Sequence, residues 1–244
     1  MPKKYSRIVE LSAIEISDIS MSLRETVKRD QKRLKKITLT CPNEATGFQN
    51  YISKVKKLQK RFQKMAEKIE EEVLKYLKGR KMKIAIMSDS HDRWNLLEKA
   101  IQTANQASCE VLLFAGDLIA PPGIALLEQF EGMVKFVWGN NEGERVGMTR
   151  MFDKSTKIEL CGDTFEGEIG GLKVFMNHYP RYAQLASKSG ELDLCVHGHT
   201  HEYLEEKNGE CSLINPGEIQ GGKTRKSSFV IFDTKLKQAK KVNF

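Results

Sequence analysis

Apolar residues in the first third of the chain follow a helical spacing and show no strand-like alternation. The pattern predicts a helix over residues 48–78, because its apolar positions recur at alternating steps of three and four. These seam positions are Phe48, Tyr51, Val55, Leu58, Phe62, Met65 and Ile69. A poorer version of the pattern runs from Ile16 to Ile37, before a loop expected over residues 39–47. We therefore expect an antiparallel, coiled-coil-like helical hairpin as a basic extension over residues 1–81.

From residue 82 onward the pattern changes to short apolar runs bounded by polar residues. Strands and helices first alternate, and hairpin-like pairs of strands then follow beyond residue 164. The expected strands are 82–89, 111–115, 133–138, 165–169, 172–176, 203–206, 211–214, 228–232 and 240–244, with one more ending at residues 198–201, and the expected helices are 94–106 and 124–130. This α/β beginning and β-rich end predict two facing sheets with helices outside, in a domain spanning residues 82–244.

The composition is that of a folded, water-soluble chain. Of the 244 residues, 40% are hydrophobic and 30% are charged. The longest apolar stretches, such as 111–115, fall far short of the roughly 20 residues that a membrane helix needs, so no membrane span is expected. The five cysteines lie far apart without a CxxC pair, and the first residues do not form a secretory leader. We expect a cytoplasmic protein with reduced thiols.

Positive charge is concentrated in the first third of the chain. Residues 1–80 hold 20 Lys and Arg against 10 Asp and Glu, whereas residues 81–244 hold 20 against 22. Such a basic arm can attract nucleic acid, but the same charges can also be the solvated side of a helix. Its aromatic residues keep the seam spacing, so nucleic acid is possible and not favoured. One hairpin buries little surface, so it either packs on its own chain or forms a homodimer through residues 8–78.

Polar residues that can ligate metals follow the ends of five expected strands. They form the ordered set Asp-x-His, Gly-Asp, Gly-Asn, His and Gly-His-x-His, and the side chains concerned are Asp89, His91, Asp117, Asn140, His178, His199 and His201. Alternate residues that leave a strand point the same way, and parallel strand ends meet at one sheet edge, so these side chains should converge. Seven oxygen or nitrogen ligands are too many for one tetrahedral zinc and suit two ions about 3.5 to 4 Å apart.

This ordered set resembles the calcineurin-like metallophosphoesterase superfamily, and within it the small single-domain phosphodiesterases of bacteria and archaea. The resemblance covers residues 82–244: residues 82–92 look like the ordinary opening of that family, and Asn215-Pro216-Gly217 resembles its late turn, with Glu218 where a serine is usual. It implies a four-layer αββα sandwich, preceded here by an added helical hairpin. It also implies a metal-dependent hydrolase.

Carried over to this sequence, the family pattern implies a dinuclear centre bridged by Asp117. One ion would be held by Asp89, His91, Asp117 and His201, and the other by Asp117, Asn140, His178 and His199. Manganese is favoured, with iron, zinc and nickel open. The implied reaction is hydrolysis of a small nucleotide or another phosphodiester through attack of a metal-bridging hydroxide, while both ions neutralise charge on the phosphoryl oxygens.

Four further polar residues lie close to the expected ligands in the sequence. Asn141 stands where many members of the superfamily have a His that can protonate the leaving oxygen. Asn cannot act as a general acid, so the change bears on the range of leaving groups, and Asn141 is expected to hydrogen-bond a phosphate oxygen instead. Asp92 and Glu142 are candidates to orient metal-ligating His or Asn side chains, and the alternative is that both are solvated loop carboxylates. His197 alternates out of register with His199 and is expected to pack or to support a ligand rather than to bind metal.

Two other functions remain as alternatives to the phosphodiesterase. A protein-binding scaffold, similar to a trafficking subunit of the same fold, would have lost metal ligands, and none is missing here. A nucleic-acid-directed phosphodiesterase would hold the phosphate backbone through the basic arm, and its binding would fall steeply with salt.

Overall fold

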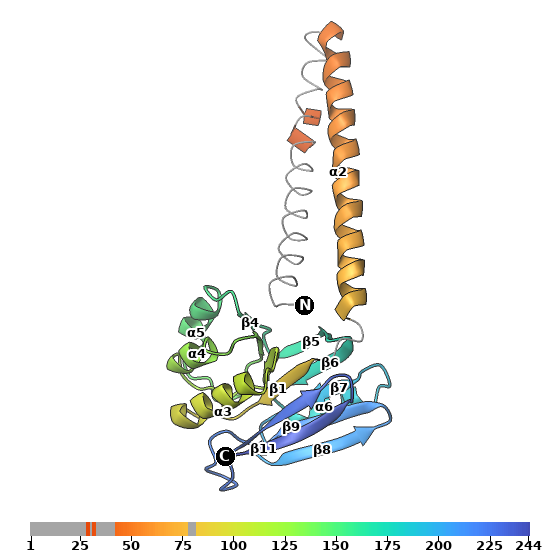
Figure 1. Ribbon diagram of the computed structural model, residues 1–244. Helices are drawn as coiled ribbons and strands as arrows, with labels where there is room; N and C mark the ends of the chain where they lie inside the picture. The colour runs from red at the N-terminus through yellow and green to blue at the C-terminus, as the bar shows by residue number, and fades with distance from the viewer. Residues whose placement is uncertain (1–27, 30, 33–41, 78–81) are drawn as a thin grey trace. The chain divides into compact units, whose positions relative to one another are not determined.

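The computed structural model describes residues 28–29, 31–32, 42–77 and 82–244, and the chain divides into two compact units, residues 1–78 and 79–244 (Figure 1). In the first unit, helix α2 spans Pro42–Leu77. The loop expected over residues 39–47 is therefore wrong for residues 42–47. Proline suits the first turn of a helix, where its missing N–H needs no partner. Most of the other expected helix, residues 16–37, lies outside the described residues, so the hairpin stays a prediction.

One stripe of α2 is apolar and buried. Phe48, Ile52 and Val55 form a cluster at helical spacing, and the last two are buried. Tyr51 and Leu58, expected in the seam, are 45% and 43% exposed in the single chain, so their place in a seam stays a prediction. The remaining seam residues, whose side chains lie outside those the structure describes, are Phe62, Met65 and Ile69. No helix in the described part of the chain is both long and apolar enough to span a bilayer.

The second unit is built on two β-sheets (Figure 1). The first sheet has the spatial order β11 (Gln238–Asn243), β10 (Ser228–Asp233), β1 (Lys83–Met87), β2 (Val111–Phe114), β3 (Met133–Phe136) and β4 (Ile158–Leu160). Its strands β1 to β4 are parallel, and β10 and β11 complete it in antiparallel pairs. The second sheet has the order β5 (Thr164–Ile169), β6 (Leu172–Asn177), β7 (Leu194–Val196), β9 (Cys211–Pro216) and β8 (Tyr203–Asn208).

Helices cover the outer faces of the two sheets. The first sheet packs against α3 (Trp94–Gln106), α4 (Pro122–Leu127) and α5 (Arg145–Phe152), and the second against α6 (Pro180–Ser187). Strand β1 shows the reason, because Ala85 and Met87 join the core under the helices while Ile84 and Ile86 join the core between the sheets. A strand buried on both faces reads as a continuous apolar run. The expected fold of two facing sheets flanked by helices is confirmed.

The sequence pattern missed three short elements of this unit. Helices α5 and α6 have eight residues each, and β4 has three, which is too short for a periodic signal. The helix expected over 124–130 begins earlier, at Pro122, and ends at Leu127. The second half is therefore less purely β than expected, since α6 lies within it.

Candidate metal centre

Loops that leave the carboxyl ends of five strands carry the expected ligands. Strands β1, β2, β3, β6 and β7 end at residues 87, 114, 136, 177 and 196, so each ligand lies one to five residues beyond its strand. Five of the seven have a positive φ, namely Asp89, His91, Asp117, His199 and His201. Such backbone is uncommon outside glycine and clusters at functional sites. The side chains therefore converge through left-handed turns, and not through the strand alternation from which their convergence was expected.

Asp89, His91 and His201 form the first group of potential ligands. Their ligand atoms all lie within 4.8 Å of one another. Asp89 Oδ1 is 3.7 Å from His91 Nε2 and 3.5 Å from His201 Nε2. Asp89 Oδ1 and His91 Nε2 are buried and have no hydrogen-bond partner. Buried polar atoms normally have a hydrogen-bond partner. Two buried ligand atoms that face each other without such a partner fit a cation bound between them.

Asp117 and His178 form the second group together with Asp89. His178 Nε2 lies 3.6 Å from Asp117 Oδ2, and His91 Nε2 lies 3.4 Å from the same oxygen. One carboxylate oxygen of Asp117 therefore faces an imidazole from each group. This is the position that a carboxylate shared between two ions requires.

The tautomer of His178 gives a second indication that this group fits a cation. His178 Nδ1 is 2.7 Å from the carbonyl oxygen of Ala115, so it carries the proton and donates it there. A neutral ring then turns the lone pair of Nε2 toward Asn140 Oδ1, which is 2.9 Å away. His199 Nδ1 lies 2.8 Å from the same oxygen. A lone pair so close to a carbonyl oxygen repels it unless a proton or a metal ion lies between them.

Glu218 hydrogen-bonds His201, another of the expected ligands. No role was assigned to Glu218 from the sequence. His201 Nδ1 donates to Glu218 Oε2 at 2.7 Å, which leaves Nε2 free to face Asp89. The other carboxylate oxygen, Oε1, accepts from the backbone N–H groups of Lys223 and Thr224 and from the Thr224 hydroxyl. Burial raises the pKa of Glu218, but the bonds from Thr224 and His201 outweigh it and lower the pKa. The sequence feature that could have indicated this role is the carboxylate directly after the Asn-Pro-Gly turn.

Mutual charges favour the ionised forms of Asp89 and His91. Burial raises the pKa of Asp89, but the adjacent His91 and the nearby imidazoles outweigh this and lower the pKa. Burial lowers the pKa of His91, but the carboxylates of Asp89, Asp117 and Glu218 reverse this and raise the pKa. Without an ion, the group therefore favours a proton on His91, which a metal must displace.

The other candidate residues lie close to the centre but act on different partners from those expected. Asn141 donates from its backbone and side-chain nitrogens to both carboxylate oxygens of Asp117, at 2.9 and 2.7 Å. Glu142 accepts from the backbone N–H groups of Gly139 and Leu118, so it joins two loops rather than orienting a ligating side chain. Burial and the charge of Asp117 raise the pKa of Glu142.

In the described part of the chain, no hydrogen bond or ion pair joins the side chain of Asp92 or His197 to that of an expected ligand. Asp92 is exposed, and its carboxylate bonds to the backbone of Ala120. His197 is buried beside Asn215, with Nδ1 3.2 Å from the amide nitrogen of that residue, and its Nε2 has no hydrogen-bond partner. Burial lowers the pKa of His197, so the ring is held neutral.

We expect Glu218→Gln to lower turnover by about 10- to 100-fold, the usual cost of removing a partner that orients a metal-bound imidazole. The amide no longer attracts the Nδ1 proton of His201, and it offers only one oxygen to the two sets of donors. Turnover and bound metal per chain measure the effect. The matched control is Glu202→Gln, an exposed carboxylate in the neighbouring segment. Wild-type turnover in Glu218→Gln would contradict this role.

Comparisons with known proteins agree on the class to which this arrangement belongs. Residues 82–237 match the calcineurin-like phosphoesterase superfamily domain. The phosphodiesterase MJ0936 of Methanocaldococcus jannaschii is 32% identical over 163 residues, which cover 66% of this chain and 98% of that protein. A solved archaeal phosphodiesterase superimposes with a TM-score of 0.63 at 32% identity, over 67% of this chain and 100% of that one. The resemblance in the strand-end motifs is confirmed, and the chain belongs to the calcineurin-like phosphoesterase superfamily, a family of hydrolases.

Proposed function

We propose that the protein is a phosphodiesterase that hydrolyses a small phosphodiester at a dinuclear metal centre. The observation that carries this proposal is the position of Asp117, whose Oδ2 faces His91 Nε2 and His178 Nε2 at 3.4 and 3.6 Å. The name of the archaeal relative supports the diester as substrate. The ligands would be divided as the family pattern implies, and the mixed oxygen and nitrogen donors suit manganese, iron, zinc or nickel, of which we favour manganese.

Two divalent ions bound there would supply a water of lowered pKa and neutralise charge on the phosphoryl oxygens. The residues of the chain prepare the site for this chemistry. Ala115 and Glu218 fix the rings of His178 and His201 with Nε2 turned inward. The two donors of Asn141 fix the plane of the Asp117 carboxylate. In the overall reaction water adds to phosphorus, one P–O ester bond breaks, and a monoester and an alcohol leave.

Asn141 has no proton to transfer to the departing oxygen, and it is already engaged with Asp117. The rate should therefore depend strongly on how well the leaving group carries negative charge. A phosphodiester with an aryl leaving group should react faster than a matched phosphodiester with an alkyl leaving group.

Hydrolysis of bis(p-nitrophenyl) phosphate, compared with p-nitrophenyl phosphate, tests the proposal. Both should be assayed after removal of metal with a chelator and after addition of manganese, iron, zinc or nickel. We expect no turnover without metal, restoration by at least one ion, and a higher kcat/KM for the diester. Preference for the monoester would contradict the proposed substrate class. Turnover that survives metal removal would contradict the metal dependence.

A further inference from the structure

A pocket of about 790 Å³ shares a wall with the candidate metal centre. Gln220 forms part of this wall: its backbone N–H donates to the carbonyl oxygen of Asp89 at 3.1 Å, and its side-chain amide nitrogen is 3.0 Å from His201 Nδ1. Arg93, at another edge of the pocket, lies two residues after His91. The pocket therefore lies beside the segments that carry Asp89, His91 and His201.

Four positively charged side chains line the pocket: Arg93, Arg225, Lys226 and Lys241. Among the residues that the structure describes, no carboxylate forms an ion pair with any of them, and Lys241 lies over the Tyr203 ring at 4.5 Å. The pocket has no acidic side chain in its lining. Like charges gathered without counter-charges repel one another, so their grouping in one hollow favours an anionic ligand.

The loop that carries two of these charges is fixed to the metal centre. Glu218, which holds His201 through Oε2, accepts through Oε1 from the backbone N–H groups of Lys223 and Thr224. Arg225 and Lys226 follow directly. The carboxylate that accepts from His201 thus anchors the backbone directly before these two residues, whose own side chains are exposed.

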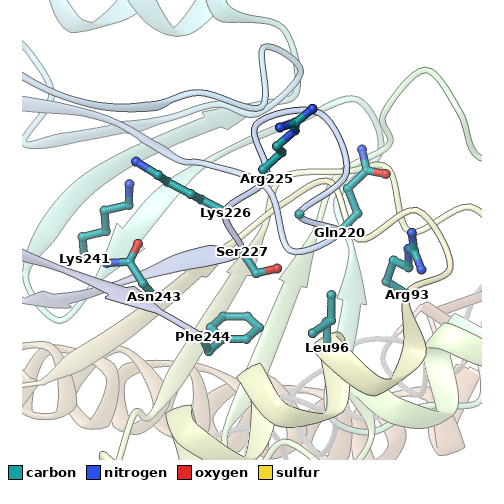
Figure 2. Close-up of a pocket in the computed structure, with 10 residues that line it drawn as sticks. Arg93, Leu96, Gln220, Arg225, Lys226, Ser227, Lys241, Asn243 and Phe244 are labelled. Atoms are coloured by element: carbon teal, nitrogen blue, oxygen red, sulfur yellow. The ribbon is translucent and has the colours of Figure 1, made fainter.

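Apolar and polar side chains share the rest of the lining. Figure 2 shows Leu96 and Phe244 beside the helix that begins near Arg93, and Ser227 and Asn243 also line the pocket. Arg225 and Lys226 lie across from Leu96 and Phe244, with Lys241 near one end and Arg93 at the opposite end.

We propose that this pocket binds a second phosphate group of the substrate, one that is not hydrolysed. The preferred substrate is then a small phosphodiester that carries a terminal phosphate monoester. Arg93 and Arg225 suit a phosphate because a guanidinium group can donate two parallel hydrogen bonds to its oxygens. These residues determine specificity and take no part in the reaction itself. The inference rests on the proposed phosphodiesterase function and deepens it.

A matched pair of substrates tests the inference: thymidine 5′-(p-nitrophenyl phosphate) with and without a 3′-phosphate. The two share the scissile bond and the leaving group and differ by one dianion. We expect the wild type to have a kcat/KM that is about tenfold or more higher for the 3′-phosphorylated compound, mainly through KM. The ratio should fall as salt rises, because exposed charges are screened.

The double variant Arg225→Gln/Lys226→Gln should bring this ratio close to one. The matched control, Lys235→Gln/Lys240→Gln, removes two exposed charges elsewhere on the surface and should keep the wild-type ratio. A wild-type ratio near one, or an unchanged ratio in Arg225→Gln/Lys226→Gln, would overturn the inference. Hydrolysis of the diester without a 3′-phosphate would in either case leave the proposed function intact. A 3′-(methyl phosphate) compound mimics a continuing nucleic acid strand, and equal kcat/KM for it would overturn the assignment of a small molecule.

Calorimetry separates the inference from the proposed function if neither ester is hydrolysed. Thymidine 3′,5′-bisphosphate should then bind the wild type about tenfold more tightly than thymidine 5′-phosphate, and Arg225→Gln/Lys226→Gln should abolish the difference. Equal affinities in the wild type would overturn the inference without reference to turnover.

Discussion

Asp117→Asn is expected to lower phosphodiesterase turnover by about 10³-fold or more, because the shared negative charge of a two-ion site contributes several kcal/mol to transition-state stabilisation. The substitution removes this charge from a buried position where Asp117 Oδ2 faces the Nε2 atoms of His91 and His178. It also replaces one acceptor of the two Asn141 hydrogen bonds by a donor. Bound metal should fall below two ions per chain. Turnover and metal analysis on the same preparation measure both effects.

The control for this variant is Asp153→Asn, an exposed carboxylate at the end of α5. It removes the same charge and should keep wild-type turnover. Two ions per chain together with near-normal turnover in Asp117→Asn would show that this carboxylate does not bridge the centre.

The second large effect is expected for Gly139→Ala, because the loops after β2 and β3 touch at this glycine. A Cβ atom at position 139 would overlap Asp117 Oδ1 and lie 2.5 Å from the Asp117 backbone nitrogen. The loop cannot easily retreat, since the Gly139 N–H donates to the buried Glu142 carboxylate. Overpacking of this kind lowers the free energy of unfolding by about 1–3 kcal/mol. The displaced carboxylate should lower turnover by about 100-fold.

Gly143→Ala provides a matched control for Gly139→Ala, because a Cβ at position 143 would meet no atom within 4 Å. It should have little effect on thermal unfolding and turnover, which are the two measurements needed. If Gly139→Ala resembled Gly143→Ala in both, the close approach of the two loops would not matter for the site.

The order of strands and helices in the second unit could be predicted from the sequence where an element was long or buried on both faces. Strand β1 and helix α3 were found on these grounds. Helices α5 and α6 were not, although the shorter α4 was, because eight residues give a weak periodic signal and α6 lies among strands. In the first unit, residues 42–47 were expected in a loop, although proline is compatible with a first helical turn and α2 begins at Pro42.

The neighbourhood of the ligands could be predicted because each follows a strand end, but the contacts within the centre could not. The partners of Glu218 and Asn141 depend on where loops distant in sequence meet, and no pattern along the chain reports this. The same holds for the basic pocket, whose charges come from the segment around Arg93, the loop that holds Arg225 and strand β11. The oligomeric state and the packing of the first unit stay predictions.

Counting the metal ions bound to the purified protein tests the central claim most directly. The chain should be freed of metal with a chelator, titrated with manganese, and analysed for bound ions per chain alongside turnover of the aryl diester. We expect two ions per chain, with full turnover only when the second is bound. Full turnover at one ion per chain, or no binding beyond one, would contradict a dinuclear centre.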